Sequence, residues 1–224
     1  RHVVDAHGAR LFTVVAEAGL GKSRLLREFC AWLELQPERV VVFTGHATQD
    51  QLRVPYGIFR NLLAGCFDMQ ESDTAEQARA KLVRGVRALA STGDDETAHV
   101  VGYLIGLDFP DSPFLRRLRH EPDRMRARAF EQMTSLFTSA AAAGPVCLVF
   151  EDIHWADDGS LRLIEHIFEH AEHSPLHAVA LARPLLLERS DGWLRSCANH
   201  ARIELAALPE PAAVQLAVAL FGKL

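Results

Sequence analysis

The stretch from residue 11 to residue 26 limits what this chain can fold into more than any other part of the sequence. An apolar run, Leu11 to Val15, leads into a short loop with two glycines, and the loop leads into Lys22-Ser23 at the start of an amphipathic segment. All positions but one match the pattern G-x-x-x-x-G-K-[ST]. This order of strand, glycine-containing loop and helix predicts a phosphate-binding loop in an α/β domain.

The loop residues suit a polyphosphate because such a ligand carries several negative charges. Backbone N–H groups at a helix N-terminus and in a glycine-containing turn can surround these charges. We expect Lys22 to contact the β- and γ-phosphates and the Ser23 hydroxyl to bind Mg²⁺ beside the phosphate oxygens. The predicted nucleotide-binding residues are Glu17, Ala18, Gly19, Leu20, Gly21, Lys22, Ser23 and Arg24.

The first position of the pattern is Ala16 instead of glycine. Alanine is compatible with the loop if this residue has a negative φ and if no bare backbone is needed there, but a methyl group is a source of weakened binding. The alternative interpretation is an ordinary strand, turn and helix with an exposed lysine. The strand and helix patterns on both sides favour the phosphate-binding loop.

The composition indicates one domain and disfavours several functional classes. At 224 residues, 49% of them hydrophobic, the chain is long enough for one α/β domain with a substantial core. The formal net charge is −5 and no basic run occurs, so we expect no direct binding of nucleic acid. We expect no membrane role, because the longest apolar runs have the length of strands. Four scattered cysteines indicate reduced thiols and a cytoplasmic protein.

The spacing of apolar residues predicts alternating strands and helices along the chain. Residues 40–43 are wholly apolar, as expected of a parallel strand buried on both faces. Residues 108–122 contain three prolines and predict a loop. The sequence also predicts a last strand over 203–205, a helix from Pro55, and helices over residues 22–35, 76–90, 95–107, 124–143, 161–172, 191–199 and 211–221.

A second apolar strand, Val146 to Phe150, ends in the acidic pair Glu151-Asp152. Strand ends are often acidic, but two carboxylates on the wall facing a phosphate-binding loop are what a Mg²⁺–nucleotide site needs. One acid binds the hydrated metal, and the other orients or deprotonates the attacking water. We assign the metal to Ser23 and Glu151 and the water to Asp152, although aspartate is more common at the metal-binding position. The division of roles between the two acids stays open.

A third apolar strand, Ala178 to Ala182, ends in Arg183-Pro184. An arginine at the end of a strand in this kind of fold can contact the γ-phosphate and report whether it is present. We therefore add Arg183 to the catalytic candidates Glu151 and Asp152. The alternative is an exposed arginine before a proline.

Residues 166–170, His-Ile-Phe-Glu-His, match the H-x-x-E-H pattern of one class of zinc protease. The pattern is short, and no distant acid is marked as a third ligand. His166 and His170 fall on the polar side of the expected helix together with His173. We therefore interpret these histidines as part of a solvated helix face.

The sequence resembles the signal-transduction P-loop ATPases with numerous domains (STAND), in particular the ATPase module of large bacterial regulators. The resemblance covers nearly the whole chain and rests on residues 16–25, 148–157 and 182–193. The E-D-x-H-W-A-D element is the most specific of these. The resemblance implies a three-layer α/β/α P-loop NTPase fold with a core sheet of five parallel strands. In that sheet the Arg183 strand lies between the strand of the phosphate-binding loop and the strand of the acids.

The same resemblance implies an ATP/ADP switch with Mg²⁺, in which hydrolysis is slow. Such modules are fused to nucleotide cyclase domains and tetratricopeptide repeats or to a helix-turn-helix. The expected partners are therefore nucleotide and other domains of the same polypeptide, and we also consider a nucleotide-dependent oligomer. The chain begins at Arg1 without methionine and contains no adenine-contact segment or winged-helix region. We interpret residues 1–224 as a P-loop ATPase domain from a longer protein.

Three hypotheses for the function follow. The first is a nucleotide switch that binds ATP and hydrolyses it slowly. The second is a degenerate nucleotide-binding scaffold without significant turnover, which the departures at Ala16 and Glu151 motivate. A kinase or a transport-type P-loop enzyme is a third hypothesis, but it needs an acceptor site, and no stretch of the sequence identifies one.

Overall fold

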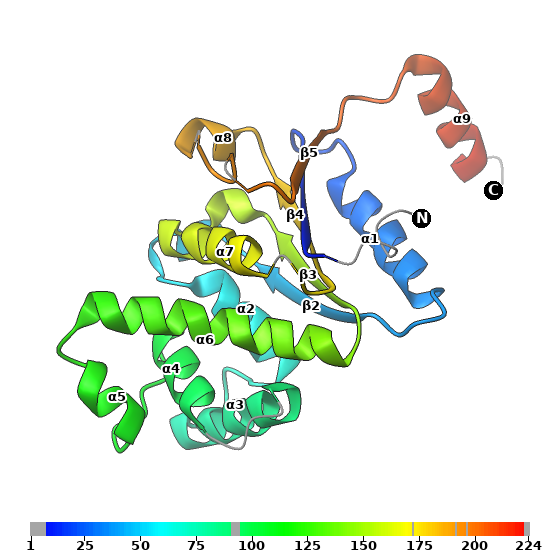
Figure 1. Cartoon of the computed structure of the whole chain (residues 1–224). Helices are drawn as coiled ribbons and strands as arrows, with labels where there is room; N and C mark the ends of the chain where they lie inside the picture. Colours follow the sequence, from blue (N-terminus) through cyan, green and yellow to red (C-terminus); the bar gives the residue numbers. More distant parts are fainter. Residues whose placement is uncertain (1–7, 91–94, 172, 191, 196, 222–224) are drawn as a thin grey trace.

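The structure is a computed structural model that describes residues 8–90, 95–171, 173–190, 192–195 and 197–221. Its centre is a five-stranded sheet, in the order β2-β3-β4-β1-β5, with helices on both faces (Figure 1). All neighbouring strands pair in parallel. The strands are β1 (Arg10–Val15), β2 (Val41–His46), β3 (Val146–Glu151), β4 (Leu176–Ala182) and β5 (His200–Glu204). The prediction of an α/β fold with a five-stranded parallel sheet is confirmed, and β4 lies between β1 and β3 as expected.

Neighbouring strands end at nearly the same level, along one edge of the sheet. Val15, the last residue of β1, pairs with Ala182, the last residue of β4. At the end of β2, His46 pairs with Glu151, the last residue of β3. Ligands of open parallel sheets bind outside this carboxyl edge. The residues that follow β1, β3 and β4 therefore share one region of the molecule.

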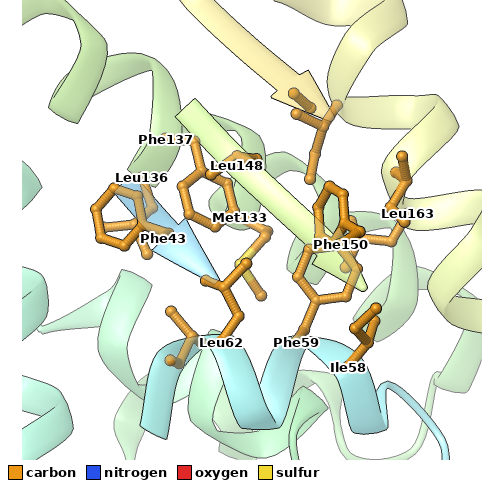
Figure 2. Close-up of a cluster of buried hydrophobic side chains, with 14 of the residues drawn as sticks. Phe43, Ile58, Phe59, Leu62, Met133, Leu136, Phe137, Leu148, Phe150 and Leu163 are labelled. Carbon is orange, nitrogen blue, oxygen red and sulfur yellow. The ribbon is translucent and has the colours of Figure 1, made fainter. Parts of the chain in front are cut away.

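One face of the sheet carries most of the hydrophobic core. It is covered by α2 (Gly57–Cys66), α6 (Pro122–Ala143) and α7 (Asp158–His170) (Figure 1). Figure 2 shows side chains of these helices packed against β2 and β3, and the rings of Phe59 and Phe150 lie 5.8 Å apart between centroids. Phe150 is fully buried. This layer therefore anchors the strand that carries the acidic pair.

The opposite face has a thinner cover, formed by α1 (Lys22–Glu34). A smaller buried cluster there includes Val14, Leu26 and Val149. Leu25 and Ile203 remain 42% exposed at its border. The last helix, α9 (Glu210–Phe221), follows β5 but lies apart from this face in Figure 1. The expected three layers are present, but the two helical layers are very unequal.

A helical insertion separates β2 from β3. It consists of η1 (Gln49–Arg53), α2, α3 (Ala75–Ala90), α4 (Glu96–Leu104), α5 (Pro113–Leu118) and α6. The expectation of a loop over residues 108–122 is wrong in part, because α5 lies within it. Pro113 occupies the first turn of α5, and the Ser112 side chain accepts a hydrogen bond from the Leu115 amide. These residues mark a helix start.

The helix α6 extends over 22 residues and confirms the strong start and stop signals in the sequence. It begins at Pro122 and is followed by Gly144. Its exposed side carries ion pairs such as Arg126–Asp123, at 2.6 Å. Among the described residues, no helix has both the length and the apolar character needed to cross a bilayer.

Two further expectations are wrong. β2 is an edge strand and is not buried on both faces, because Val41 and Val42 are 41% and 38% exposed. An apolar run alone does not distinguish an edge strand from a central one. The helix expected over 191–199 is not found in the described part of that range, where residues 192–195 form turns. A short helix, α8 (Leu185–Arg189), forms earlier, directly after Pro184. Residues 172, 191 and 196 of the expected helices lie outside the described residues.

Candidate functional site

The loop between β1 and α1 begins as an extension of the sheet. The amide of Ala16 donates a hydrogen bond to the carbonyl of Ala182 at 3.1 Å, so the pairing of β1 with β4 continues past Val15. Ala16 is 3% exposed, and its φ is not positive. Alanine is therefore compatible with the backbone at the position where the motif has glycine.

Two glycines shape the remainder of the loop. Gly19 and Gly21 have left-handed backbone conformations, with φ of 83° and 94°, which glycine adopts at lower cost than other residues. Gly21 is the N-cap of α1, and no described side chain caps this helix. The first amides of α1, those of Lys22 and Ser23, have no acceptor within the helix. They are placed to bind an anion.

Lys22 folds back over this loop. Its Nζ donates hydrogen bonds to the carbonyls of Ala16 and Glu17, at 2.7 and 2.9 Å. Partial burial lowers the pKa of Lys22, and the charge of Arg183 lowers it further, whereas Asp152 and Glu17 act in the opposite direction. The ammonium group therefore lies within the electrostatic reach of charged groups from the ends of two other strands.

The acidic pair spans the end of β3 and the start of a turn. Side chains alternate along a strand, so Glu151 follows Cys147 and Val149 on the face covered by α1. Burial raises the pKa of Cys30 on α1, and the charge of Glu151 adds to this effect. Asp152 has left the strand and lies in the left-handed region, with φ of 50°, which aspartate tolerates better than most residues. The two carboxylates therefore belong to different local structures.

The turn after the acids encloses a histidine. It forms the 3₁₀ turn η2 (Ile153–Trp155), and the side chain of His154 has no exposed surface. Neither ring nitrogen of His154 has a hydrogen-bond partner among the residues that the structure describes. Burial lowers the pKa of His154 to about 4, so the ring is neutral at pH 7. The sequence showed this histidine within the E-D-x-H-W-A-D element but suggested no role for it.

The end of β4 supplies arginines to the same region. Arg183 directly follows β4 and is exposed. At the end of α8, Arg189 donates hydrogen bonds to the carbonyls of His154, at 3.0 Å, and of Ala156. The helix that follows Arg183 is thus tied to the turn that follows Asp152. No pattern in the sequence pointed to Arg189.

The fold brings the predicted residues together at one edge. The neighbouring strands β1, β4 and β3 end in the glycine loop, Arg183 and the Glu151-Asp152 pair, in that spatial order. The predicted metal ligands, Ser23 and Glu151, offer the oxygen atoms that Mg²⁺ prefers. The side chain of Arg24, another predicted site residue, pairs with Glu28 at 2.7 Å along the helix surface. Together these groups can accommodate a polyphosphate and a divalent cation.

A protein-family model matches most of the chain. The model of the AAA ATPase domain matches residues 2–180, which include both the glycine loop and the acidic pair. The chain belongs to the AAA ATPase domain family. It is therefore a P-loop ATPase module, as the sequence resemblance predicted at this level. Arg183 and the residues after it lie beyond the matched segment of the AAA ATPase domain.

Two solved structures resemble this AAA ATPase domain at low identity. One is described as the structure of Drosophila ORC bound to DNA; it is 15% identical, with a TM-score of 0.34, over 90% of this chain and 83% of the other. The other is the unbound bacterial conjugative coupling protein TrwBdeltaN70; it is 14% identical, with a TM-score of 0.34, over 84% and 67%. Neither likeness informs the function of the AAA ATPase domain. No curated protein sequence matches the chain significantly.

The H-x-x-E-H residues lie on α7 of the AAA ATPase domain. The rings of His166 and His170 stack with centroids 4.1 Å apart, and Nδ1 of His170 donates to the carbonyl of His166 at 2.8 Å. Within the described ranges, no group of three or more His, Cys, Asp or Glu residues could hold a metal ion. His170 is exposed, as expected of a solvated helix face, but His166 is half-buried, and its ring lies 5.4 Å from that of Phe130 on α6 between centroids.

Proposed function

We propose that this domain is a nucleotide switch that binds ATP, hydrolyses it slowly and belongs to a bacterial signalling or transcription regulator. The observation that carries the proposal is the placement of Lys22, Arg183 and the acidic pair at the ends of three neighbouring parallel strands. A triphosphate and its metal need cationic, anionic and backbone N–H groups within a few ångströms of one another. The strand order supports such an arrangement.

Each group at this edge has a chemical role in the proposal. The amides of residues 17–24 surround the phosphates, and Lys22 exchanges its bonds to the Ala16 and Glu17 carbonyls for bonds to phosphate oxygens. Ser23 and Glu151 hold Mg²⁺, which when bound neutralises charge on the phosphate oxygens. Asp152 orients the attacking water, and Arg183 contacts the γ-phosphate.

The regulatory part of the proposal rests on the sequence resemblance. Hydrolysis sets a timer, because the ATP and ADP states favour different arrangements of neighbouring domains. The partners are a cyclase domain, tetratricopeptide repeats or a helix-turn-helix in the same polypeptide, and assembly into an oligomer depends on the nucleotide. The free thiols of all four cysteines fit a cytoplasmic location.

A binding experiment with two lysine variants tests the proposal. We expect the purified protein to bind ATP with Mg²⁺ and Lys22→Ala to weaken binding by roughly 30-fold or more, since removing one member of a charge pair costs about 2–5 kcal/mol. Lys81→Ala is the matched control, because Lys81 pairs with Asp73 on the helical insertion, at 2.8 Å. Calorimetric titration gives the affinities. Equal binding by the wild type and Lys22→Ala contradicts the proposal.

The scaffold hypothesis is the second candidate, and Glu151 favours it. Glutamate occupies the end of β3 where aspartate more commonly binds the metal, whereas Ala16 fits its backbone without strain. Release of inorganic phosphate by the same preparations separates the two functions. Measurable release that Lys22→Ala abolishes supports the switch. Tight binding of co-purified ADP without phosphate release supports the scaffold.

A further inference from the structure

The buried ring of His154 has polar atoms that no described group satisfies. Its side chain is 0% exposed, and both Nδ1 and Nε2 are without a partner in the described part of the chain. Leaving a buried polar group unpaired costs about 1–3 kcal/mol. Native proteins rarely retain such a group without a reason. A phenylalanine or leucine would fill the same space without this cost.

The carboxylate of Asp152 lies close to this ring, just beyond hydrogen-bond distance. The distance from His154 Nδ1 to Asp152 Oδ1 is 3.9 Å, which is longer than the 2.7–3.2 Å of a typical N–H···O hydrogen bond. The Asp152 side chain is 39% exposed, so it has room to rotate, whereas the ring is enclosed. A modest rotation of Asp152 is therefore the simplest way to satisfy Nδ1.

The surroundings hold the ring in place for such a contact. Arg189 binds the backbone carbonyls on both sides of Trp155, those of His154 and Ala156. The ring of Trp155 lies against the imidazole, with centroids 4.9 Å apart. Arg189 of α8 therefore holds the turn in place. Of the two side chains, His154 and Asp152, the imidazole is the one that stays fixed.

We propose that His154 is a positioning residue for Asp152: its Nδ1–H donates to the carboxylate when nucleotide and metal are bound and so directs one oxygen of Asp152 toward the attacking water. This inference rests on the proposed function. The ring is neutral at pH 7, because burial lowers the pKa of His154 to about 4. It therefore carries one N–H for this purpose, and its other nitrogen carries none.

Three substitutions separate positioning from packing. His154→Phe keeps a ring of similar size but removes the donor. His154→Asn places an amide nitrogen close to the position of Nδ1, whereas His154→Gln places it close to Nε2. A packing role predicts that Phe is the best replacement. The positioning role predicts that Asn is the best.

Turnover and affinity are measured separately for each variant. We expect His154→Phe and His154→Gln to lower kcat by about 10- to 100-fold, the effect typical of losing a partner that orients a functional group. Their affinity for Mg²⁺–ATP should stay within about 2-fold, or less than 0.5 kcal/mol. His154→Asn should recover most of the lost kcat.

His177→Phe is the matched control. His177 also has a buried Nδ1 without a described partner, but it lies near the start of β4, at the opposite end from Arg183. Its replacement should change thermal stability and leave kcat unchanged. A kcat loss in His177→Phe equal to that in His154→Phe assigns both effects to stability and overturns the proposal.

A second measurement does not depend on turnover. In ¹⁵N spectra of the wild-type protein, the Nδ1 signal of His154 should change on addition of Mg²⁺ with a non-hydrolysable ATP analogue, and Asp152→Asn should reduce the change. If nucleotide binds but His154→Phe retains full kcat or the Nδ1 signal stays constant, the role of His154 is wrong and the proposed function stands. If the wild type binds no nucleotide, the proposed function itself fails.

Discussion

The two strand ends that supply most of the candidate site are built in opposite ways. At the end of β1, residues 17–19 are exposed, and the groups for an anion are backbone amides and one flexible lysine. At the end of β3, the strand is buried, and the groups are carboxylates beside an enclosed histidine. Ligand binding at the end of β1 depends on backbone conformation, whereas the chemistry at the end of β3 depends on the identity of the side chains.

This difference assigns separate tasks to the two ends. A loop of backbone amides recognises charge and shape, so it contributes to ground-state binding of the phosphates. Oriented carboxylates act on the attacking water, so they contribute mainly in the transition state. Variants at the end of β1 should therefore change affinity, and variants at the end of β3 should change turnover.

The largest effect is expected for Asp152→Asn. The amide has nearly the same shape as the carboxylate but cannot accept a proton, so kcat should fall by about 10²- to 10⁴-fold. The affinity for Mg²⁺–ATP should change little. Asp158→Asn is the control, because the Asp158 side chain is 73% exposed on α7. Phosphate release and calorimetry give the two quantities, and an equal loss of binding and turnover would remove the proposed division of tasks.

The second prediction concerns acid stability at the end of β3. Burial lowers the pKa of His154 from an ordinary value near 6.5 to about 4, helped by the charges of Arg183, Lys22 and Arg189 and opposed by Asp152. Above pH 6.5 the His154 ring is neutral in both the folded and the unfolded chain. As pH falls below 6.5, His154 takes up a proton in the unfolded chain before it does so in the folded protein, so the folded protein loses stability.

The unfolding free energy should therefore decrease by about 3 kcal/mol between pH 6.5 and 4 through this group alone. Denaturant unfolding of the wild type and His154→Phe at several pH values isolates the contribution of His154, because the other histidines are common to both proteins. The stability difference between the two proteins should shift in favour of the variant as pH falls. Parallel stability curves would show that the ring does not titrate in this way.

The smallest effect is expected for Gly21→Ala at the end of β1. An added Cβ meets no atom within 4 Å, so only the positive φ opposes the substitution. A left-handed backbone conformation costs about 1–2 kcal/mol for a residue with a Cβ. Alanine should therefore change the shape of the loop and lower the affinity for ATP by roughly 10-fold. Gly65→Ala on α2 is the control, because its Cβ also meets no atom but its φ is not positive. Equal affinities of Gly21→Ala and Gly65→Ala for ATP would contradict a binding site formed by the loop backbone.

Sequence patterns predicted the parts of the site that depend on local chain order. The glycine and lysine spacing located the loop, and apolar runs ending in acids or arginine located the other two strand ends. The order of the strands followed from the family resemblance, because a local pattern contains no information about which strands are neighbours. The structure agrees with the order β3-β4-β1.

The remaining features depend on contacts between distant residues. The bond from Arg189 to the His154 carbonyl joins residues 35 positions apart, and no periodicity marks it. The burial of His154 depends on how β4 and α8 pack against η2. The exposure of β2 depends on its position at the edge of the sheet. Propensity and spacing contain none of this information.

The helical insertion between β2 and β3 affects how the protein reaches its native state. Val41 pairs with Val146, across more than 100 residues of chain. Closing a loop of this length carries a substantial entropic cost before any pairing compensates for it, and such non-local contacts slow folding. The helices of the insertion can form early from contacts close in sequence. The pairing of β1 with β4 spans a still longer stretch, with Arg10 opposite His177. We therefore expect β2 and β3 to pair first in a newly synthesised chain, once residue 151 has left the ribosome, and β1 to join the sheet only after β4 has followed.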